Sequence, residues 1–532
     1  MNNHLPDPIG DAFAGKWKAR HIDGAALETD LTLEADVVIV GTGAGGGTTA
    51  ERLSQAGLSV ILLEEGGLRT SRDFQLKEQL SYPALYQESA GRKTMDHGIG
   101  ILQGRTVGGS TVVNWTTSIR TPENTLKHWR EHFGLGALTP EALAPWFEQR
   151  EERLSIAAWP TPPNRHNALL RDGAYKLALE PVTIHRNVKG CWNLGYCGMG
   201  CPTNAKQSML VTTIPAAMDH GARLLSHMWA ERLEHAKGRV SALIAHPIDA
   251  RGQVRRERSV RLQARHYVLA GGAIGTPALL LRSDAPDPYA LTGARTFLHP
   301  VVASAALMAE PVDAFSGAPQ SIYVDDYLWP KDGGMGFKLE VPPVHPLIAS
   351  VVMSDYGQAH RHYMRQMNHW YVAIALLRDG FDEQSQGGRV VLDSHGDPQL
   401  DYPLTDYLWA GARRAYHAMA DLQFAVGAKT VLPVHLDATA LRRVGDAHSA
   451  IDALPMKARR AKVVSAHVMG GAGMSATEQG GVVRPDGVHY QLENLSVHDG
   501  SILPTSLGAN PQLTIYGLSA MLSAQLAQRL TP

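Results

Sequence analysis

Apolar runs at the start of the chain alternate with a glycine-rich turn and a helical stretch. Residues 35–40 and 58–63 are almost continuously apolar, so each segment predicts a buried strand. Between them lie a glycine-rich turn at 41–46 and a stretch at 48–55 that favours a helix. A strand, a glycine turn, a helix and a second strand are typical of a parallel sheet covered by helices. We therefore expect an α/β fold that opens with a Rossmann-like domain.

Later segments repeat parts of this pattern. Residues 239–247 and 255–264 flank a turn at 249–252 and predict a hairpin. Residues 267–282 pass from one apolar run through glycines into another, which again predicts a strand, a turn and a helix. We expect this second unit to close the same sheet.

The middle of the chain follows a different pattern. Helical spacing at 140–155 is followed by a Pro-rich linker, and residues 406–426 predict a long helix. Residues 389–392 and 399–402 flank a turn and predict another hairpin. The fold class is therefore α/β in the opening part and α+β overall, with an inserted domain of sheet and helices.

Composition and charge exclude several classes of function. The 532 residues carry a net charge of −1, so no basic excess indicates nucleic-acid binding. Glycine and proline interrupt the apolar windows, which predicts no membrane span, and the start lacks the basic and apolar regions of a signal peptide. The three cysteines all lie between positions 191 and 201 and predict no disulfide framework. We expect a cytoplasmic protein.

The first glycine turn and the acid after the second strand form a dinucleotide-binding pattern. Glycines let backbone amides approach a pyrophosphate, and the N-terminus of the following helix stabilises its charge. Glu64 follows Gly46 by 18 residues, where a carboxylate can bind ribose hydroxyls. The pattern predicts a dinucleotide site without distinguishing NAD from FAD.

A second glycine cluster spans residues 104–115. We interpret it as a strand that keeps side chains away from one face, so that an isoalloxazine ring could lie against the backbone. An ordinary Gly-Gly bend is the alternative, and it is slightly favoured when the cluster is considered alone.

The C-terminal part of the chain contains candidate catalytic groups. His467 precedes a pair of glycines, and Asn510-Pro511 opens an apolar run. An imidazole can accept a proton near neutral pH, and an amide can bond the same oxygen. Between them, Asp499-Gly500 suits a close backbone approach to a cofactor. For an isolated His–Asn pair, a core histidine and a helix-capping asparagine would be the commoner interpretation.

Together these segments resemble one family, the glucose–methanol–choline flavoprotein oxidoreductases. The resemblance spans residues 36–526 and is loosest over 300–460. The long-chain alcohol oxidase and dehydrogenase branch is the most similar. Its resemblance is carried by Gly195-Tyr-Cys-Gly-Met-Gly-Cys201, by Phe297-Leu-His299-Pro300 and by the His467/Asn510 combination.

The resemblance implies FAD, with its ring between residues 108–114 and the pair His467/Asn510. It implies that the ribose lies on Glu64 and the pyrophosphate along residues 41–46 and Asp499-Gly500. The expected cofactor-binding residues are Gly41, Thr42, Gly43, Ala44, Gly45, Gly46, Glu64, Gly104, Arg105, Val107, Gly108, Gly109, Ser110, Asn114, Asp499, Gly500, Asn510 and Pro511.

Domain limits follow from the same resemblance. We expect residues 1–130, 191–299 and 461–532 to form the FAD-binding domain. Residues 131–190 and 300–460 are expected to form the substrate-binding domain. Apolar runs at 347–353 and 370–377 are candidates for a channel that holds an alkyl chain, although such runs are more often plain core strands.

The expected function is oxidation of the CH–OH group of an alcohol, either primary or long-chain and apolar, by hydride transfer to flavin N5. His467 is the expected base, and Asn510 is expected to position the alcohol oxygen. The partners are a small alcohol and either oxygen or another electron acceptor. One alternative is a lyase of the hydroxynitrile type, in which FAD is structural.

Another alternative is a flavoprotein subunit that passes electrons to a partner. Cys191, Cys197 and Cys201 would then hold an iron–sulfur cluster, since thiolates are its usual ligands. Three small thiols in a glycine-rich loop are the favoured interpretation, and no metal site is expected. His97, before the second glycine cluster, is a candidate for covalent attachment of FAD.

Overall fold

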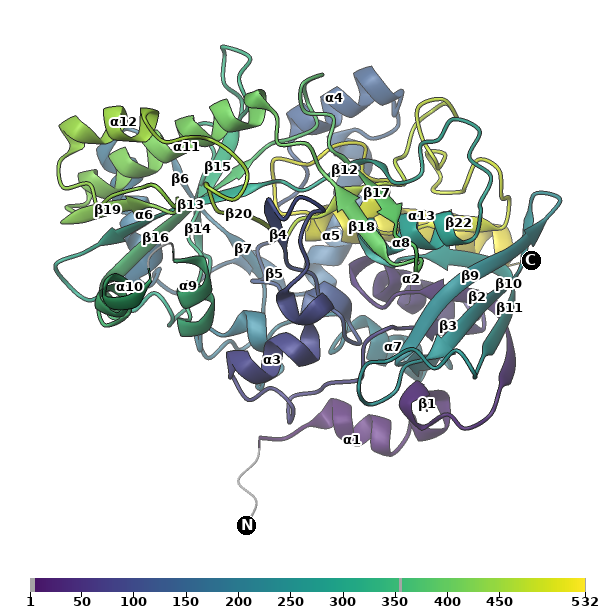
Figure 1. Cartoon of the computed structure of the whole chain (residues 1–532). Coiled ribbons are helices and arrows are strands. Elements are labelled where there is room, and N and C mark those ends of the chain that lie inside the picture. Colours follow the sequence, from purple (N-terminus) through teal and green to yellow (C-terminus); the bar gives the residue numbers. More distant parts are fainter. Residues whose placement is uncertain (1–4, 354–355, 532) are drawn as a thin grey trace.

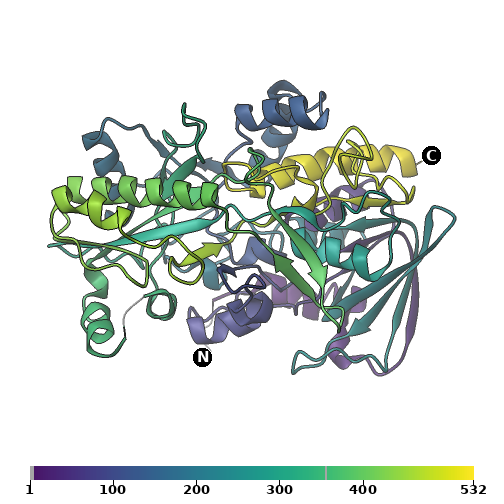
Figure 2. The ribbon, with the colours of Figure 1, turned by 45° about the horizontal axis from the view of Figure 1, so that its top comes forward.

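A computed structural model describes residues 5–353 and 356–531, and it arranges the chain around two large β-sheets (Figures 1 and 2). The fold is mixed α/β, as the sequence predicts. Among the described residues, none of the helices combines the length and apolarity needed to cross a membrane.

The first sheet contains the predicted Rossmann-like unit. β2, α2 and β3 follow one another, and β2 pairs in parallel with β3 on one side and with β11 on the other. The predicted hairpin adds antiparallel strands at the other end. The strand order is β1 (His21–Asp23), β8 (Arg223–Ser226), β3 (Val60–Leu63), β2 (Leu31–Val40), β11 (Val260–Leu269), β10 (Arg239–Pro247) and β9 (Met228–Ala236), with β22 (Leu495–Val497) also paired to β11.

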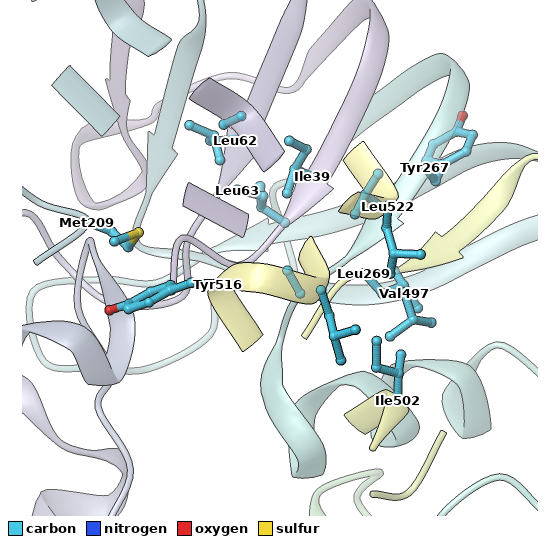
Figure 3. Close-up of a cluster of buried hydrophobic side chains, with 14 of the residues drawn as sticks. Ile39, Leu62, Leu63, Met209, Tyr267, Leu269, Val497, Ile502, Tyr516 and Leu522 are labelled. Atoms are coloured by element: carbon cyan, nitrogen blue, oxygen red, sulfur yellow. The ribbon is translucent and has the colours of Figure 1, made fainter. Parts of the chain in front are cut away.

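Helices from distant parts of the sequence cover this sheet. α2 (Ala44–Gln55) packs against α7 (Thr213–Asp219) and against α13 (Gln512–Leu530), which also packs against α5 (Pro140–Arg153). Figure 3 shows the buried cluster that joins the sheet to α13. Its labelled members are Ile39, Leu62, Leu63, Met209, Tyr267, Leu269, Val497, Ile502, Tyr516 and Leu522.

The second sheet has one covered face and one face that turns toward the first domain. α11 (Asp406–Ala425), whose N-terminus is capped by Thr405, lies over the covered face (Figure 1). The strand order is β4 (Ile99–Ile101), β20 (Val463–Ser465), β13 (Val301–Leu307), β16 (Trp370–Leu377), β15 (Phe337–Glu340), β14 (Ile322–Val324) and β6 (Pro181–Thr183), with β19 (Thr430–Pro433) also paired to β13.

Short pieces of the segments expected in the FAD-binding domain belong to this second sheet. β4 and β20 pair in parallel, and β20 pairs with β13. Each has only three residues, which is too short for a periodic signal in the sequence. The second sheet is therefore built from several separate stretches of the chain, and the domain limits stay a prediction.

Two smaller sheets and further helices complete the fold. The second predicted hairpin is present as β17 and β18. The smaller sheets are β18 (Pro398–Asp401), β17 (Gly388–Leu392), β12 (Ala294–Phe297) and β21 (Met469–Gly470), and the pair β5 (Ile156–Ala158) and β7 (His185–Asn187). The remaining α-helices are α1 (Pro8–Ala14), α3 (Glu78–Leu85), α4 (Glu123–Phe133), α6 (Arg165–Lys176), α8 (Gly272–Arg282), α9 (Pro346–Val352), α10 (Gly357–Met364) and α12 (Val444–Asp452).

The second glycine cluster forms a bend and not a strand. Gly108 has a φ of 97° and Gly109 a φ of 55°, and a 3₁₀-helix follows at Gly109–Val112. Two successive left-handed glycines turn the chain sharply, which an extended strand cannot do. The alternative interpretation as a Gly-Gly bend is therefore the better description.

Candidate functional site

A cavity of about 1650 Å³ lies between the first sheet and the open face of the second. Its wall includes the first glycine turn, the C-terminal segment around Asn510, and strands β13 and β16. Ligand sites for single small molecules are typically about 300–1,000 Å³, so the cavity has room for a large cofactor and a substrate together.

The glycine turn at one end of the cavity is shaped for backbone contact. A Cβ at Gly41 would lie 2.2 Å from the Ala270 carbonyl oxygen, and one at Gly45 would lie 1.5 Å from that of His498. Only glycine allows these close approaches. The N-terminus of α2 has no side-chain cap at Gly43, so its amides remain available to an anion. These features fit a pyrophosphate.

Glu64 fits the expected ribose contact. One carboxylate oxygen accepts hydrogen bonds from the Thr42 amide and hydroxyl, at 3.1 and 2.5 Å, and the other accepts one from the Gly66 amide at 2.9 Å. A carboxylate has about four acceptor positions, so one remains for a ligand hydroxyl. Burial raises the pKa of Glu64 to about 7, and a hydroxyl donor from the cavity would favour the charged form.

The Asp499 carboxylate organises the backbone around the cavity. It accepts hydrogen bonds from the Gly272 amide at 2.8 Å and the Thr276 hydroxyl at 2.6 Å. Its other oxygen accepts bonds from the amide and hydroxyl of Ser501. Asp499 thus ties the start of α8 to the C-terminal segment, and the neighbouring Gly500 lines the cavity.

Most of the expected cofactor residues line the cavity, but three lie behind its wall. Val107 is fully buried in the core, and Gly46 packs against the Gly41 carbonyl. The Gly108 amide donates to the Thr42 hydroxyl at 2.8 Å. Those that line the cavity are Gly41, Thr42, Gly43, Ala44, Gly45, Glu64, Gly104, Arg105, Gly109, Ser110, Asn114, Asp499, Gly500, Asn510 and Pro511.

His467 and Asn510, 43 positions apart in the sequence, meet at the cavity wall. Asn510 Nδ2 lies 3.4 Å from His467 Nε2. On the opposite edge of the imidazole, Nδ1 lies 3.1 Å from the Nδ1 atom of His299. Burial and the nearby Lys338 ammonium lower the pKa of His467 to about 3, so the imidazole is uncharged at neutral pH. A neutral imidazole whose Nε2 carries no proton can accept one.

His299 is held by a buried scaffold. Its backbone amide donates to Asp379 at 3.0 Å, and the Tyr402 hydroxyl donates to the same carboxylate at 2.7 Å. The residue is fully buried with a φ of 47°, and burial is the main cause that keeps the pKa of His299 well below its usual value. The sequence pointed to the Phe-Leu-His-Pro segment only through its family resemblance.

Two further polar residues at the site were missed in the sequence. Lys338 Nζ lies 2.6 Å from Asn510 Oδ1 and 2.8 Å from Glu340 Oε1. Both charged side chains are at most 1% exposed. The available signal was the alternation of polar and apolar residues in the strand Phe337–Glu340, but that pattern usually marks a solvent-facing strand edge.

The second sheet gives the cavity an apolar region next to the His–Asn pair. β13 and β16 present alternate residues to it, while the residues between them face α11. Part of the run expected as an alkyl channel, on α9, lies along the same region. The lining residues are Val301, Ala303, Ala305, Val344, Ile348, Val352, Met353, Met364, Met367, Trp370, Val372, Ile374, Leu376, Leu432 and Val434.

The three cysteines do not gather into a metal site. Over residues 5–353 and 356–531, no group of three or more His, Cys, Asp or Glu side chains is arranged to hold a metal ion. The Lys206 ammonium instead donates to three carbonyl oxygens near Cys197, those of Val112, Asn114 and Cys197, each at 2.7 Å. The iron–sulfur alternative stays a prediction. His97 lines the cavity, and its covalent role remains a prediction.

Comparison with known proteins agrees with the fold and with the family resemblance. A protein of Mycobacterium tuberculosis, an uncharacterised GMC-type oxidoreductase, is 30% identical over 526 residues, which cover 96% of this chain and 80% of the relative. A long-chain-alcohol oxidase of Arabidopsis thaliana is 27% identical over a match that covers 94% of this chain and 68% of the oxidase. The structure of formate oxidase from Aspergillus oryzae has a TM-score of 0.69 and 16% identity over 95% of this chain and all of that one, which indicates a shared fold.

The sequence profiles of one family match most of the chain. Its N-terminal profile, described as GMC oxidoreductase, covers residues 62–301, and its C-terminal profile covers residues 383–519. These segments include Glu64, His467 and Asn510, whereas the first glycine turn and most of the apolar lining lie outside them. The chain therefore belongs to the GMC oxidoreductase family of FAD-dependent flavoproteins.

Proposed function

We propose that this protein oxidises the CH–OH group of an apolar alcohol, either primary or long-chain. The observation that carries the proposal is the position of His467 and Asn510. Their side chains lie 3.4 Å apart at the point where the cofactor end of the cavity meets its apolar region. A proton acceptor and an amide donor are thus available to one alcohol oxygen.

Each side chain has a distinct role in this proposal. Asn510 Nδ2 donates a hydrogen bond to the alcohol oxygen and orients it. His467 Nε2 accepts the hydroxyl proton as the C–H bond breaks. Bound FAD supplies the acceptor for the hydride. The apolar lining excludes water and holds the alkyl part of the substrate in place.

The apolar region supports a substrate with an alkyl body. Val301, Ile374 and Leu376 form a buried cluster beside Trp115, and methionines extend the lining toward α10. Flexible methionine side chains adapt to the shape of a long chain. The long-chain-alcohol oxidase named among the relatives agrees with this substrate class.

Anaerobic reduction tests the proposal directly. Straight-chain primary alcohols from 4 to 16 carbons would be added to the FAD-loaded protein, and flavin absorbance would be followed by stopped flow. We expect the flavin to be bleached, with an optimum among the longer chains. Methyl ethers of the same length serve as controls, because they fill the same space but offer no hydroxyl proton.

The outcomes distinguish the competing functions. No bleaching with any alcohol would contradict the proposal. Cleavage of a cyanohydrin while the flavin stays oxidised would favour a lyase. Admission of oxygen after reduction then shows whether the reduced enzyme reacts with oxygen itself or needs another acceptor.

A further inference from the structure

Lys338 is a buried ammonium at the proposed reaction centre. Its side chain is 1% exposed, and Nζ lies 5.2 Å from the centre of the Tyr323 ring. The ammonium contacts the Asn510 amide oxygen at 2.6 Å and the Glu340 carboxylate at 2.8 Å. A buried charge is costly to desolvate, so an ion pair placed at this point requires a reason other than stability.

The strand β15 sets the position of both charges. Residues two apart on a strand share one face, so Lys338 and Glu340 both point away from the apolar core, in which Phe337 and Leu339 are packed. Glu340 is fixed further by Gln320, whose Nε2 donates to Oε2 at 2.5 Å. The Gln320 side-chain oxygen Oε1 in turn accepts a hydrogen bond from the Thr117 hydroxyl at 2.7 Å. Gln320 and Thr117 therefore hold the Glu340 carboxylate in one position.

The two charges act on opposite ends of the Asn510 amide. The ammonium can only donate, so the end of the amide that faces Lys338 must be the oxygen. The NH₂ end then lies 3.4 Å from both Glu340 Oε2 and His467 Nε2. A rotation of the amide by 180° would place its NH₂ against the ammonium and its oxygen against the carboxylate. Two unfavourable contacts therefore prevent the opposite orientation.

The orientation of Asn510 determines the tautomer of His467. Because an NH₂ group faces Nε2, that nitrogen is favoured as the acceptor and the imidazole proton lies on Nδ1. Nδ1–H then donates to His299 Nδ1 at 3.1 Å. The same ammonium lowers the pKa of His467, although burial is the larger cause.

We propose that Lys338, balanced by Glu340, is a positioning residue that fixes the Asn510 amide with its donor end toward His467 and the substrate oxygen and so keeps His467 Nε2 unprotonated. This inference deepens the proposed alcohol oxidation and rests on it for its kinetic consequence. Its structural consequence, the tautomer of His467, does not depend on the substrate.

A double-mutant cycle tests whether Lys338 acts through Asn510. Lys338→Met/Glu340→Gln removes both charges together and keeps similar side-chain volumes. We expect the rate of anaerobic flavin reduction to fall about 10- to 100-fold, since a misoriented group can cost about a hundredfold, with little change in the alcohol dissociation constant. When Asn510→Ala is already present, adding Lys338→Met/Glu340→Gln should lower the reduction rate by less than a further twofold. The amide that Lys338 orients is then absent, so removal of the charges has nothing left to change.

The control removes a positive charge outside the site. Lys331→Met, at an exposed position, should leave the reduction rate unchanged. If the double variant fails to bind FAD, Lys338→Met alone replaces it, because it removes the ammonium and keeps the hydrogen bond from Gln320 to Glu340. Additive losses in the cycle, or a reduction rate within twofold of the parent enzyme, would overturn the proposal.

A second measurement needs no alcohol. Nitrogen-15 NMR of histidine-labelled, FAD-loaded protein reports which ring nitrogen carries the proton, with His467 assigned by the loss of its signals in His467→Gln. We expect an unprotonated Nε2 in the parent enzyme and a mixture of tautomers in Lys338→Met/Glu340→Gln. Protonated Nε2 in the parent would refute the role of Lys338. Absence of flavin reduction together with the expected tautomer would refute only the alcohol oxidation.

Discussion

The Nδ1 atoms of His299 and His467 lie 3.1 Å apart, so one imidazole must donate a hydrogen bond to the other. If His299 donated, the His467 proton would lie on Nε2 and would face the NH₂ group of Asn510. The arrangement therefore favours His467 as the donor and His299 as the acceptor. His299 is thus expected to hold His467 in the tautomer that can act as a base.

Substitution of His299 tests this relationship. His299→Asn places an amide oxygen near the position of Nδ1, and asparagine tolerates the φ of 47° at this residue. His299→Leu removes the acceptor. We expect His299→Leu to lower the flavin reduction rate by about 10- to 100-fold and His299→Asn to lower it only a few-fold. Equal rates in the two variants would contradict the role as acceptor.

His467 and Asn510 are expected to differ in importance. A general base contributes about a hundred- to ten-thousandfold, so His467→Ala should lower the reduction rate by at least about tenfold while FAD stays bound. Asn510→Ala should cost less, because the amide only orients and polarises the alcohol. Stopped-flow reduction and flavin content measure both effects. A larger loss from Asn510→Ala would reverse the assigned roles.

The pH dependence should lack the acid limb of an ordinary histidine. Burial and the Lys338 ammonium lower the pKa of His467 to about 3, so the imidazole remains a base as the pH falls through 6.5. His299 beside it is also uncharged, since burial lowers its pKa too. We expect the rate constant for flavin reduction to stay flat from pH 8 to about 5. A loss of activity near pH 6.5 that is absent in His467→Ala would refute this.

Substitutions at two glycines of the first turn should have different effects, one on folding and the other on cofactor binding. A Cβ at Gly45 would overlap the His498 carbonyl oxygen at 1.5 Å, so Gly45→Ala should unfold or strongly destabilise the protein. At Gly43 the nearest atom, Gly109 Cα, is 3.9 Å away, and φ is −70°. Gly43→Ala should therefore keep the melting temperature of the FAD-free protein and weaken FAD binding. Gly445→Ala, on α12 with open space around it, is the control.

The sequence predicts the cofactor end of this site better than the substrate end. The glycine turn and Glu64 are consecutive in one strand–turn–helix–strand unit, so local spacing is sufficient to place them. His467 and Asn510 were identified because each stands beside a glycine or proline turn. Their convergence required the whole fold.

Lys338 and the Gly-Gly bend show why the rest could not be predicted. Alternating polar and apolar residues do not reveal whether the polar face of β15 meets solvent or a cavity, because that depends on the first domain. The sequence leaves both a strand and a bend open for the glycine cluster, because glycine permits both extended and left-handed backbone. The strands β4 and β20 are too short to be detected, yet they link the two sheets.

The strand β13 provides a scale for the length of the alkyl chain. Val301, which follows the His299-Pro300 segment, Ala303 and Ala305 line the cavity in turn. Residues two apart on a strand are separated by about 6.6 Å, so Ala303 and Ala305 lie at increasing distances from His299. About five methylene groups of an extended chain span that step.

Leucine at either alanine should therefore block a different length of substrate. Each leucine should set a maximum chain length above which alcohols bind weakly, and this maximum should be shorter for Ala303→Leu than for Ala305→Leu. Below its maximum chain length, each variant should keep the flavin reduction rate of the parent enzyme. Dissociation constants from anaerobic titration across 4 to 16 carbons would give the two limits. Ala306→Val, on the face that packs against α11, should change stability but not the preferred length. If both lining variants shifted the preference by the same amount, the alkyl chain would not run along β13.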